Sequence, residues 1–203
     1  MAADGLNMRW KQVNLKRKLW HFSTGSFIVS VLIWNYPSKR IPLLILGGSA
    51  LVLLIMDILR FGTGWGRQLF HIYFGQLAGR KEDEGPNASF FYAVSLLVAV
   101  LLFEPRIAMG AIISLAIGDP VAGIVGTLFG RVRIKGKAVE GAVANLAASF
   151  FLINLLVPSP WTAFAGAASG AVVELIHIPK VDDNLSVPIV AGLVMTIVQP
   201  LIS

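Results

Sequence analysis

A single carboxylate lies inside a long apolar stretch of this sequence. Between Ile107 and Gly130 the only formally charged residue is Asp119. A carboxylate at membrane depth costs at least about 2.5 kcal/mol, so its presence needs a chemical explanation. The residues that share its face of a helix are small: Ala122 or Gly123, then Gly126 and Gly130.

Two explanations fit this face. Small residues at such spacing often form a contact between membrane helices. Glycines also let the phosphates of a ligand approach the backbone. Packing needs no charge, so the carboxylate of Asp119 favours the ligand explanation.

Two further charged groups open the next apolar stretch. Lys137 and Glu140 are three residues apart, which places them on neighbouring faces of a helix. A lysine at a span end commonly extends its charge toward the membrane surface. It could equally meet a phosphate, with Glu140 beside it. The residues alone slightly favour the surface anchor.

Two acids and an amide precede the last apolar stretch, as Asp182-Asp183-Asn184. Such residues stabilise the first turn of a helix through capping and the helix dipole. Carboxylate and amide oxygens are also ligands for a hard cation such as Mg²⁺. The sequence leaves both interpretations open.

The first apolar stretch follows Arg17-Lys18-Leu19-Trp20-His21. Trp20 is typical of a membrane-interface anchor, and the two cations beside His21 could also bind phosphate. His71 and His177 have no comparable neighbours in the sequence. We interpret both as hydrogen-bonded or solvated histidines.

The composition indicates which elements must position these groups. Of the 203 residues, 56% are apolar and only 14% are charged, against about a quarter in soluble domains. We therefore predict an all-α, polytopic integral membrane protein, one domain over 1–203 with about seven transmembrane helices in one bundle. The predicted spans are 22–36, 41–56, 88–103, 107–129, 138–157, 161–176 and 185–202, with an amphipathic helix over 66–78.

Charge predicts the orientation of this bundle. Counted over alternate gaps between the seven spans, 14 of the 17 Lys and Arg residues fall on one side, and three (Lys39, Arg40 and Arg106) fall on the other. The positive-inside rule places the N-terminus in the cytoplasm and the C-terminus outside. The net charge of +6 then suits anionic headgroups and phosphates rather than nucleic acid. The chain has no cysteine, which excludes disulfides, thiolate nucleophiles and Cys-ligated zinc.

Taken in order, these motifs resemble those of a known family. They are RKLWHFSTG at 17–25, DILR at 57–60, RKEDEGPNASFFY at 80–92, DPVAGIVGTLFG at 119–130, KAVEGA at 137–142 and DDNLSVP at 182–188. The chain resembles the CTP-dependent lipid kinases, which include dolichol kinase, phytol kinase and CTP-dependent diacylglycerol kinase. It is more distantly similar to phosphatidate cytidylyltransferases. One departure is that Ala138 and Ala142 replace hydroxyl residues of the family pattern K-S-x-E-G-S.

The resemblance implies transfer of the γ-phosphoryl of CTP to the hydroxyl of a membrane lipid, with Mg²⁺ or another divalent cation. This fits the residues, because phosphoryl transfer depends on metal, cations and positioning. The expected catalytic residues are Asp119, Lys137 and Glu140. The expected metal ligands are Asp119, Asp183, Asn184 and Glu140. The expected phosphate or nucleotide contacts are Arg17, Lys18, His21, Arg80, Gly123, Gly126, Gly130 and Lys135, and further candidates are Asp57, Arg60, Glu82 and Asp182.

These expectations place the active site at the cytoplasmic face, where CTP meets a lipid alcohol held in the bilayer. A polyprenol, a shorter isoprenoid alcohol and a diacylglycerol-like lipid remain open as acceptors, and oligomeric state is not indicated. A cytidylyltransferase that makes a CDP-lipid is the alternative enzyme. A transporter with a charged site at mid-membrane is the alternative from another class. The absence of an internal repeat and the gathering of charge on one face argue against transport.

Overall fold

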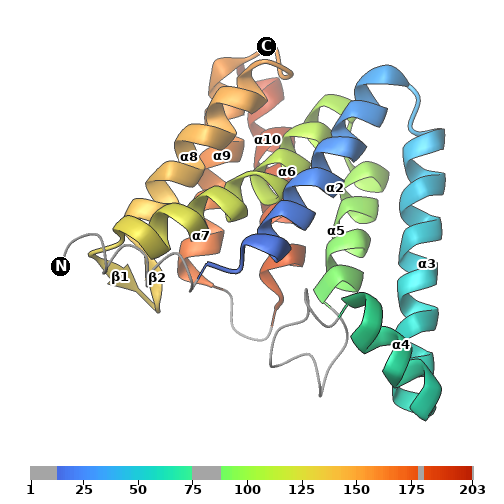
Figure 1. The fold of residues 1–203 in the computed structure, drawn as a ribbon. Helices are drawn as coiled ribbons and strands as arrows, with labels where there is room; N and C mark the ends of the chain where they lie inside the picture. Colours follow the sequence, from blue (N-terminus) through green and yellow to red (C-terminus); the bar gives the residue numbers. More distant parts are fainter. Residues whose placement is uncertain (1–12, 75–87, 178–180, 203) are drawn as a thin grey trace.

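The computed structural model describes residues 13–74, 88–177 and 181–202, and these form a helical bundle with one small hairpin (Figure 1). The elements are α2 (Leu15–Trp34), α3 (Arg40–Gly62), α4 (Gly64–Phe74), α5 (Ala88–Leu102), α6 (Pro105–Ala116), α7 (Gly118–Phe129), β1 (Arg133–Ile134), β2 (Lys137–Ala138), α8 (Val139–Asn154), α9 (Pro160–Ile176) and α10 (Asp183–Ile202). The prediction of a mostly helical membrane protein is confirmed.

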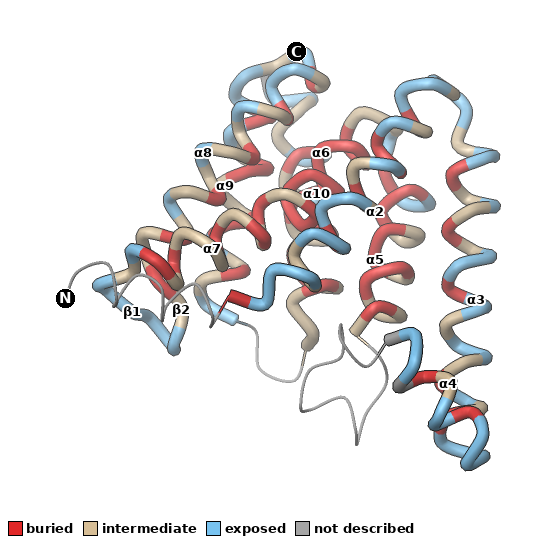
Figure 2. Tube along the Cα trace, viewed as in Figure 1, coloured by how far each residue is buried: buried red, intermediate tan, exposed pale blue. Residues whose placement is uncertain are grey.

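Helix α6 is the centre of the bundle. Every residue from Ile107 to Ala116 is buried, as the continuous red segment in Figure 2 shows. Helices α2, α5, α8, α9 and α10 all pack against it. This is possible because alanine, glycine and serine alternate with large apolar residues around the helix, so several neighbours approach closely. The side chain of Glu104 caps its first turn by accepting from the backbone N–H of Arg106 and Ile107.

The stretch 107–129, which we predicted as one span, consists of two successive helices. Helix α6 ends at Ala116 and α7 begins at Gly118. Pro120 has no N–H to donate to the carbonyl of Ala116, so a regular hydrogen-bond ladder cannot pass through this point. The stretch Pro105–Phe129 as a whole is still long and apolar enough to cross a membrane, and the break places Asp119 in the first turn of a separate helix.

Fewer of the described helices than predicted are long and apolar enough to cross a membrane. Among the described residues, α3, the pair α6–α7 taken together, and α10 are long and apolar enough to cross a membrane. Helices α5 and α8 are apolar but shorter. The predicted count of about seven transmembrane helices is therefore not confirmed. Large apolar side chains point outward from the bundle, including Leu44 at 76% exposure, as expected of a surface that faces lipid.

Helix α3 lies at the edge of the bundle. It packs along α5 and against α4, but it contacts α2 at few positions (Figure 1). Asp57 and Arg60 form a buried ion pair of 3.1 Å on α3. The Arg60 guanidinium also lies 4.1 Å from the centroid of the Phe70 ring. These contacts join α3 to α4, which occupies part of the predicted amphipathic stretch 66–78.

A hairpin that the sequence did not predict connects α7 to α8. Strands β1 and β2 pair in antiparallel register, with Ile134 opposite Lys137. The two turn residues, Lys135 and Gly136, have φ values of 48° and 89°. Left-handed φ at both central positions is typical of a tight two-residue hairpin turn. The hairpin brings Arg133 and Lys137 to the same cavity.

Candidate active site

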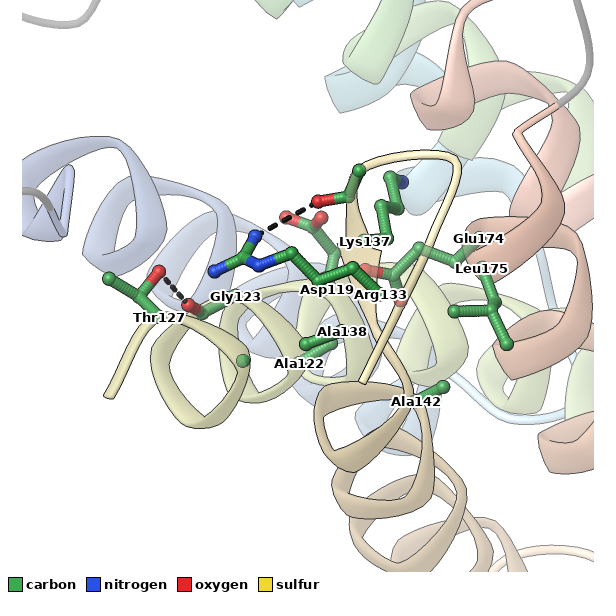
Figure 3. Close-up of a pocket in the computed structure, with 12 residues that line it drawn as sticks. Asp119, Ala122, Gly123, Thr127, Arg133, Lys137, Ala138, Ala142, Glu174 and Leu175 are labelled. Carbon is green, nitrogen blue, oxygen red and sulfur yellow. Dashed lines mark hydrogen bonds between the residues drawn. The ribbon is translucent and has the colours of Figure 1, made fainter. Parts of the chain in front are cut away.

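A charged cavity lies where α7, the hairpin, α8 and α9 meet (Figure 3). Its volume is about 190 Å³. Two carboxylates, Asp119 from α7 and Glu174 from α9, line it together with the cations Arg133 and Lys137. Acids and bases in one cavity are the combination that metal-bound phosphates require.

The N-terminal part of α2 supplies a further cation. Lys18 Nζ donates to the backbone carbonyl of Asp119 over 3.5 Å. Its ammonium lies directly over Gly123, and a Cβ at that position would overlap it. Gly123 therefore permits a side-chain cation to reach the backbone of α7, next to the cavity that Gly123 also lines.

Lys137, which lines the cavity, is held by an ion pair to α10. Its Nζ lies 2.6 Å from Asp183 Oδ2, and both side chains are partly exposed. The other oxygen, Asp183 Oδ1, lies 2.9 Å from His177 Nδ1. The predicted solvated or hydrogen-bonded state of His177 matches this contact. Asp183 orients both groups at the first turn of α10, and Asp183 itself does not line the cavity.

A buried chain of polar groups supports Glu174. The side chain of Glu174 is 6% exposed, and Asn145 Nδ2 donates to its Oε2. Ser149 Oγ in turn donates to Asn145 Oδ1 over 2.8 Å. The serine fixes which end of the amide faces the carboxylate, so Glu174 is held in one orientation toward the cavity.

Two of the predicted phosphate-binding glycines, Gly126 and Gly130, lie close against strand β2, and their phosphate-binding role stays a prediction. A Cβ at Gly126 or Gly130 would press against the Ala138 side chain. On the facing helix, a Cβ at Gly141 would collide with the carbonyl oxygen of Ala122. Helices α7 and α8 are thus in close backbone contact. Gly126 also lines the cavity.

Glu140 contacts backbone rather than the cavity. Its Oε1 accepts from the backbone N–H of Arg131 over 2.9 Å and of Val132 over 3.2 Å. These bonds fasten the segment that leads into β1. Ala138 and Ala142, where the family pattern carries hydroxyls, both line the cavity. The predicted catalytic or metal-binding role of Glu140 stays a prediction.

The remaining predicted site residues that the structure describes lie outside the lining of the cavity. His21 is buried and stacks on Tyr92, with ring centroids 4.3 Å apart. Asp182 Oδ1 accepts from the backbone N–H of the buried Asn184 over 2.9 Å. Besides Glu140 and Asp183, the predicted residues among those described that do not line the cavity are Arg17, Lys18, His21, Gly130, Lys135, Asp182, Asn184, Asp57 and Arg60. Arg80 and Glu82 lie outside the described residues.

The donor set fits a divalent cation shared with a substrate. In the part of the chain that the structure describes, no three His, Asp or Glu side chains gather as a metal cluster. Mg²⁺ usually binds through one or two carboxylates together with substrate phosphates. Asp119 and Glu174 supply two carboxylates on one cavity, which matches that pattern.

Comparisons with known proteins agree with these features. The chain is 22% identical to CTP-dependent diacylglycerol kinase 1 of Schizosaccharomyces pombe, over 93% of this chain and 95% of that protein. It is 29% identical to dolichol kinase of Saccharomyces cerevisiae, over 71% of this chain but only 28% of that larger protein. An uncharacterized protein of Methanocaldococcus jannaschii is also 29% identical, over 59% of this chain and 62% of its own length.

No family model matches the chain, and no solved structure matches it. The kinase relatives carry the argument, because the similarity to one of them spans nearly the whole of both chains. The ordered motifs and these two relatives together support the assignment of this chain to the CTP-dependent lipid kinase family.

Proposed function

We propose that this chain transfers the γ-phosphoryl of CTP to the hydroxyl of a membrane lipid alcohol at the cytoplasmic face. The observation that carries the proposal is the cavity that joins Asp119 and Glu174 to Lys137 and Arg133. The relatives named as CTP-dependent diacylglycerol kinase and dolichol kinase support the donor and the class of acceptor. A polyprenol-type or a diacylglycerol-like alcohol is the proposed acceptor.

In the proposed reaction the lipid hydroxyl oxygen bonds to the γ-phosphorus, and the bond to the β–γ bridging oxygen breaks. CDP leaves with that oxygen, and the hydroxyl proton passes to a base. Little covalent chemistry falls to the protein, so positioning and charge stabilisation provide most of the catalysis. Asp119, partly buried on α7, is the candidate for holding the hydroxyl or its proton.

The cations around the cavity would neutralise the charge of the donor. Lys137, Arg133 and Lys18 lie around the two carboxylates and would offset the charge of the triphosphate. A divalent cation held by Asp119 and Glu174 would supply further charge neutralisation on the phosphate oxygens. Incoming phosphate would compete with Asp183 for Lys137, since that lysine is already paired.

The basic residues that flank the predicted spans support a cytoplasmic site, because CTP is a cytosolic nucleotide. The direct test is purified protein with γ-labelled CTP and, in separate reactions, a panel of lipid alcohols and a panel of lipid phosphates. With the alcohols we expect labelled lipid phosphate and unlabelled CDP. Labelled pyrophosphate together with a CDP-lipid would instead establish a cytidylyltransferase. No transfer to any acceptor in either form would reject the proposal.

A further inference from the structure

An apolar groove runs between α2, α3 and α5, away from the charged cavity. Its volume is about 250 Å³. Most of its wall is hydrocarbon, supplied among others by Phe27, Leu53 and Leu96. Its hydroxyl groups are few and come from Thr24, Ser49, Ser89 and Tyr92.

The groove is open toward the lipid-facing side of the bundle. Helix α3 packs against α5 and contacts α2 at few positions, so α2 and α3 are not packed along each other. Trp20 and Phe27, on the α2 wall, are 41% and 56% exposed. A molecule that already lies in the bilayer can therefore enter from the side, without passing through water.

One end of the groove is connected to the charged cavity through α2. Tyr92 lines the groove, stacks on His21, and donates its hydroxyl to the His21 carbonyl over 2.7 Å. Lys18 precedes His21 by three residues, so the two lie on the same face of α2. Lys18 reaches the Asp119 carbonyl. The groove thus reaches Tyr92, which contacts His21, and Lys18 one turn away on the same helix face contacts Asp119.

His21 at this junction has an unused polar atom. The residue is 2% exposed, and its Nδ1 has no hydrogen-bond partner among the described residues. Buried ring nitrogens almost always have a partner in native proteins. A ligand hydroxyl at the end of the groove would supply one.

Building on the proposed function, we infer that this groove binds the hydrocarbon chain of the lipid acceptor and that His21 hydrogen-bonds the acceptor hydroxyl before that hydroxyl reaches Asp119. From Trp20 to Ile28, α2 rises about 12 Å along the groove. That covers less than half of a hydrocarbon core of about 30 Å. The groove therefore holds the segment of the acceptor nearest its hydroxyl, and the rest of the chain extends into the bilayer.

A second apolar groove, between α2, α6 and α8, is the rival site. It has a similar volume of about 240 Å³ and includes Ser30 and Leu155. Among the described residues, none of its lining side chains makes a hydrogen bond or ring contact with His21, Lys18 or Asp119. The contact between Tyr92 and His21 favours the groove between α2, α3 and α5.

Filling each groove with a tryptophan tests the choice kinetically. Ser49→Trp obstructs the proposed groove from its α3 wall, and Ser30→Trp obstructs the rival groove. Leu44→Trp is the matched control on α3, because Leu44 is 76% exposed and lines neither groove. We expect Ser49→Trp alone to raise the KM for the lipid alcohol by about tenfold, which corresponds to about 1.4 kcal/mol of acceptor binding. The KM for CTP should be unchanged in all three variants. A raised KM for the lipid alcohol in Ser30→Trp but not in Ser49→Trp would overturn the assignment. Equal KM values in all three variants would also overturn it.

A binding measurement separates this inference from the proposed function. A long-chain alcohol that carries a photoreactive diazirine is irradiated with the full chain in phospholipid vesicles, and the labelled peptides are identified by mass spectrometry. We expect labelling of α2, α3 and α5 that an excess of unlabelled long-chain alcohol removes. That result without phosphoryl transfer would support the groove while rejecting the kinase. Transfer with labelling confined to α6 and α8, or with labelling that no competitor reduces, would reject the groove while leaving the kinase intact.

Discussion

Asp119 and Glu174 are the two acids on which the proposed chemistry depends. Both line the cavity, from α7 and α9 respectively. Asp119→Asn and Glu174→Gln keep the size of each side chain and remove its charge. We expect each change to lower turnover by about 100-fold or more, the scale seen when a group that stabilises transition-state charge is removed. Turnover with γ-labelled CTP at saturating acceptor measures the effect.

Glu140→Gln is the comparison for these two variants. Its carboxylate accepts from the backbone of Arg131 and Val132 and does not line the cavity. We expect a smaller loss of turnover than in Glu174→Gln. A larger loss of turnover in Glu140→Gln than in Glu174→Gln would support a catalytic role for Glu140. Glu174 would then be a buried group that serves packing alone.

Lys137 has two separable roles, as a partner of Asp183 and as a cation for the donor. The pair is partly exposed, and such pairs contribute about 0.2–1 kcal/mol to stability. Lys137→Met and Asp183→Asn should therefore both leave the melting temperature nearly unchanged. Only Lys137→Met should lower turnover by about 100-fold. If Lys137→Met keeps nearly the turnover of the parent, Lys137 serves only as an anchor.

The sequence alone identified Asp119 and Lys137, and both reach the cavity. It did not single out Glu174, although a lone acid in an apolar stretch is the same signal that marked Asp119. Asn145, buried in the middle of α8, is a lone amide in an apolar stretch, which is a similar but weaker indication of a functional site. Arg133 could not have been found, because its position depends on a hairpin whose register is set only in the folded chain.

At the scale of elements, α7 and α8 are in close backbone contact. A Cβ on Gly141 would collide with the Ala122 carbonyl, which is backbone and cannot rotate away. We expect Gly141→Ala to destabilise the protein by about 1–3 kcal/mol, as overpacking does. Gly48→Ala on α3 is the control, because nothing lies within 4 Å of a Cβ there.

In that control, replacing a helical glycine should stabilise the protein by about 0.5–1 kcal/mol. Thermal unfolding in detergent compares the two variants on the same scale. Equal melting temperatures would show that α7 and α8 separate readily, which would contradict the close approach of Gly141 to the Ala122 carbonyl.

The helices themselves were largely predictable, since each apolar stretch became one or two helices. The break before Gly118 was missed because apolarity continues through it. Pro120 at the third position of α7 is the local sign of a new helix start. The hairpin was missed because its strands are two residues long, too short to show an alternating pattern.

At the scale of the whole molecule, the two ends of the bundle carry different connections between helices. The connection between α2 and α3 lies at the same end as the C-terminus, and the hairpin lies toward the other end (Figure 1). We expect single cysteines at Ser38 and Arg133 to react with a membrane-impermeant thiol reagent from opposite sides. Both positions are exposed, and the chain has no other cysteine. Reaction of both from one side would contradict the predicted orientation.

The lateral opening between α2 and α3 has a consequence for how the reaction depends on concentration. The relevant concentration of CTP is its amount per volume of cytosol. For an acceptor that enters from the bilayer, the relevant concentration is its amount per area of membrane. The rate should then follow the mole fraction of acceptor among the lipids. Diluting the acceptor with inert phospholipid at a fixed total amount should slow turnover, and adding more vesicles of the same composition should leave it unchanged. An enzyme fed this way would respond to the composition of the membrane in which it lies.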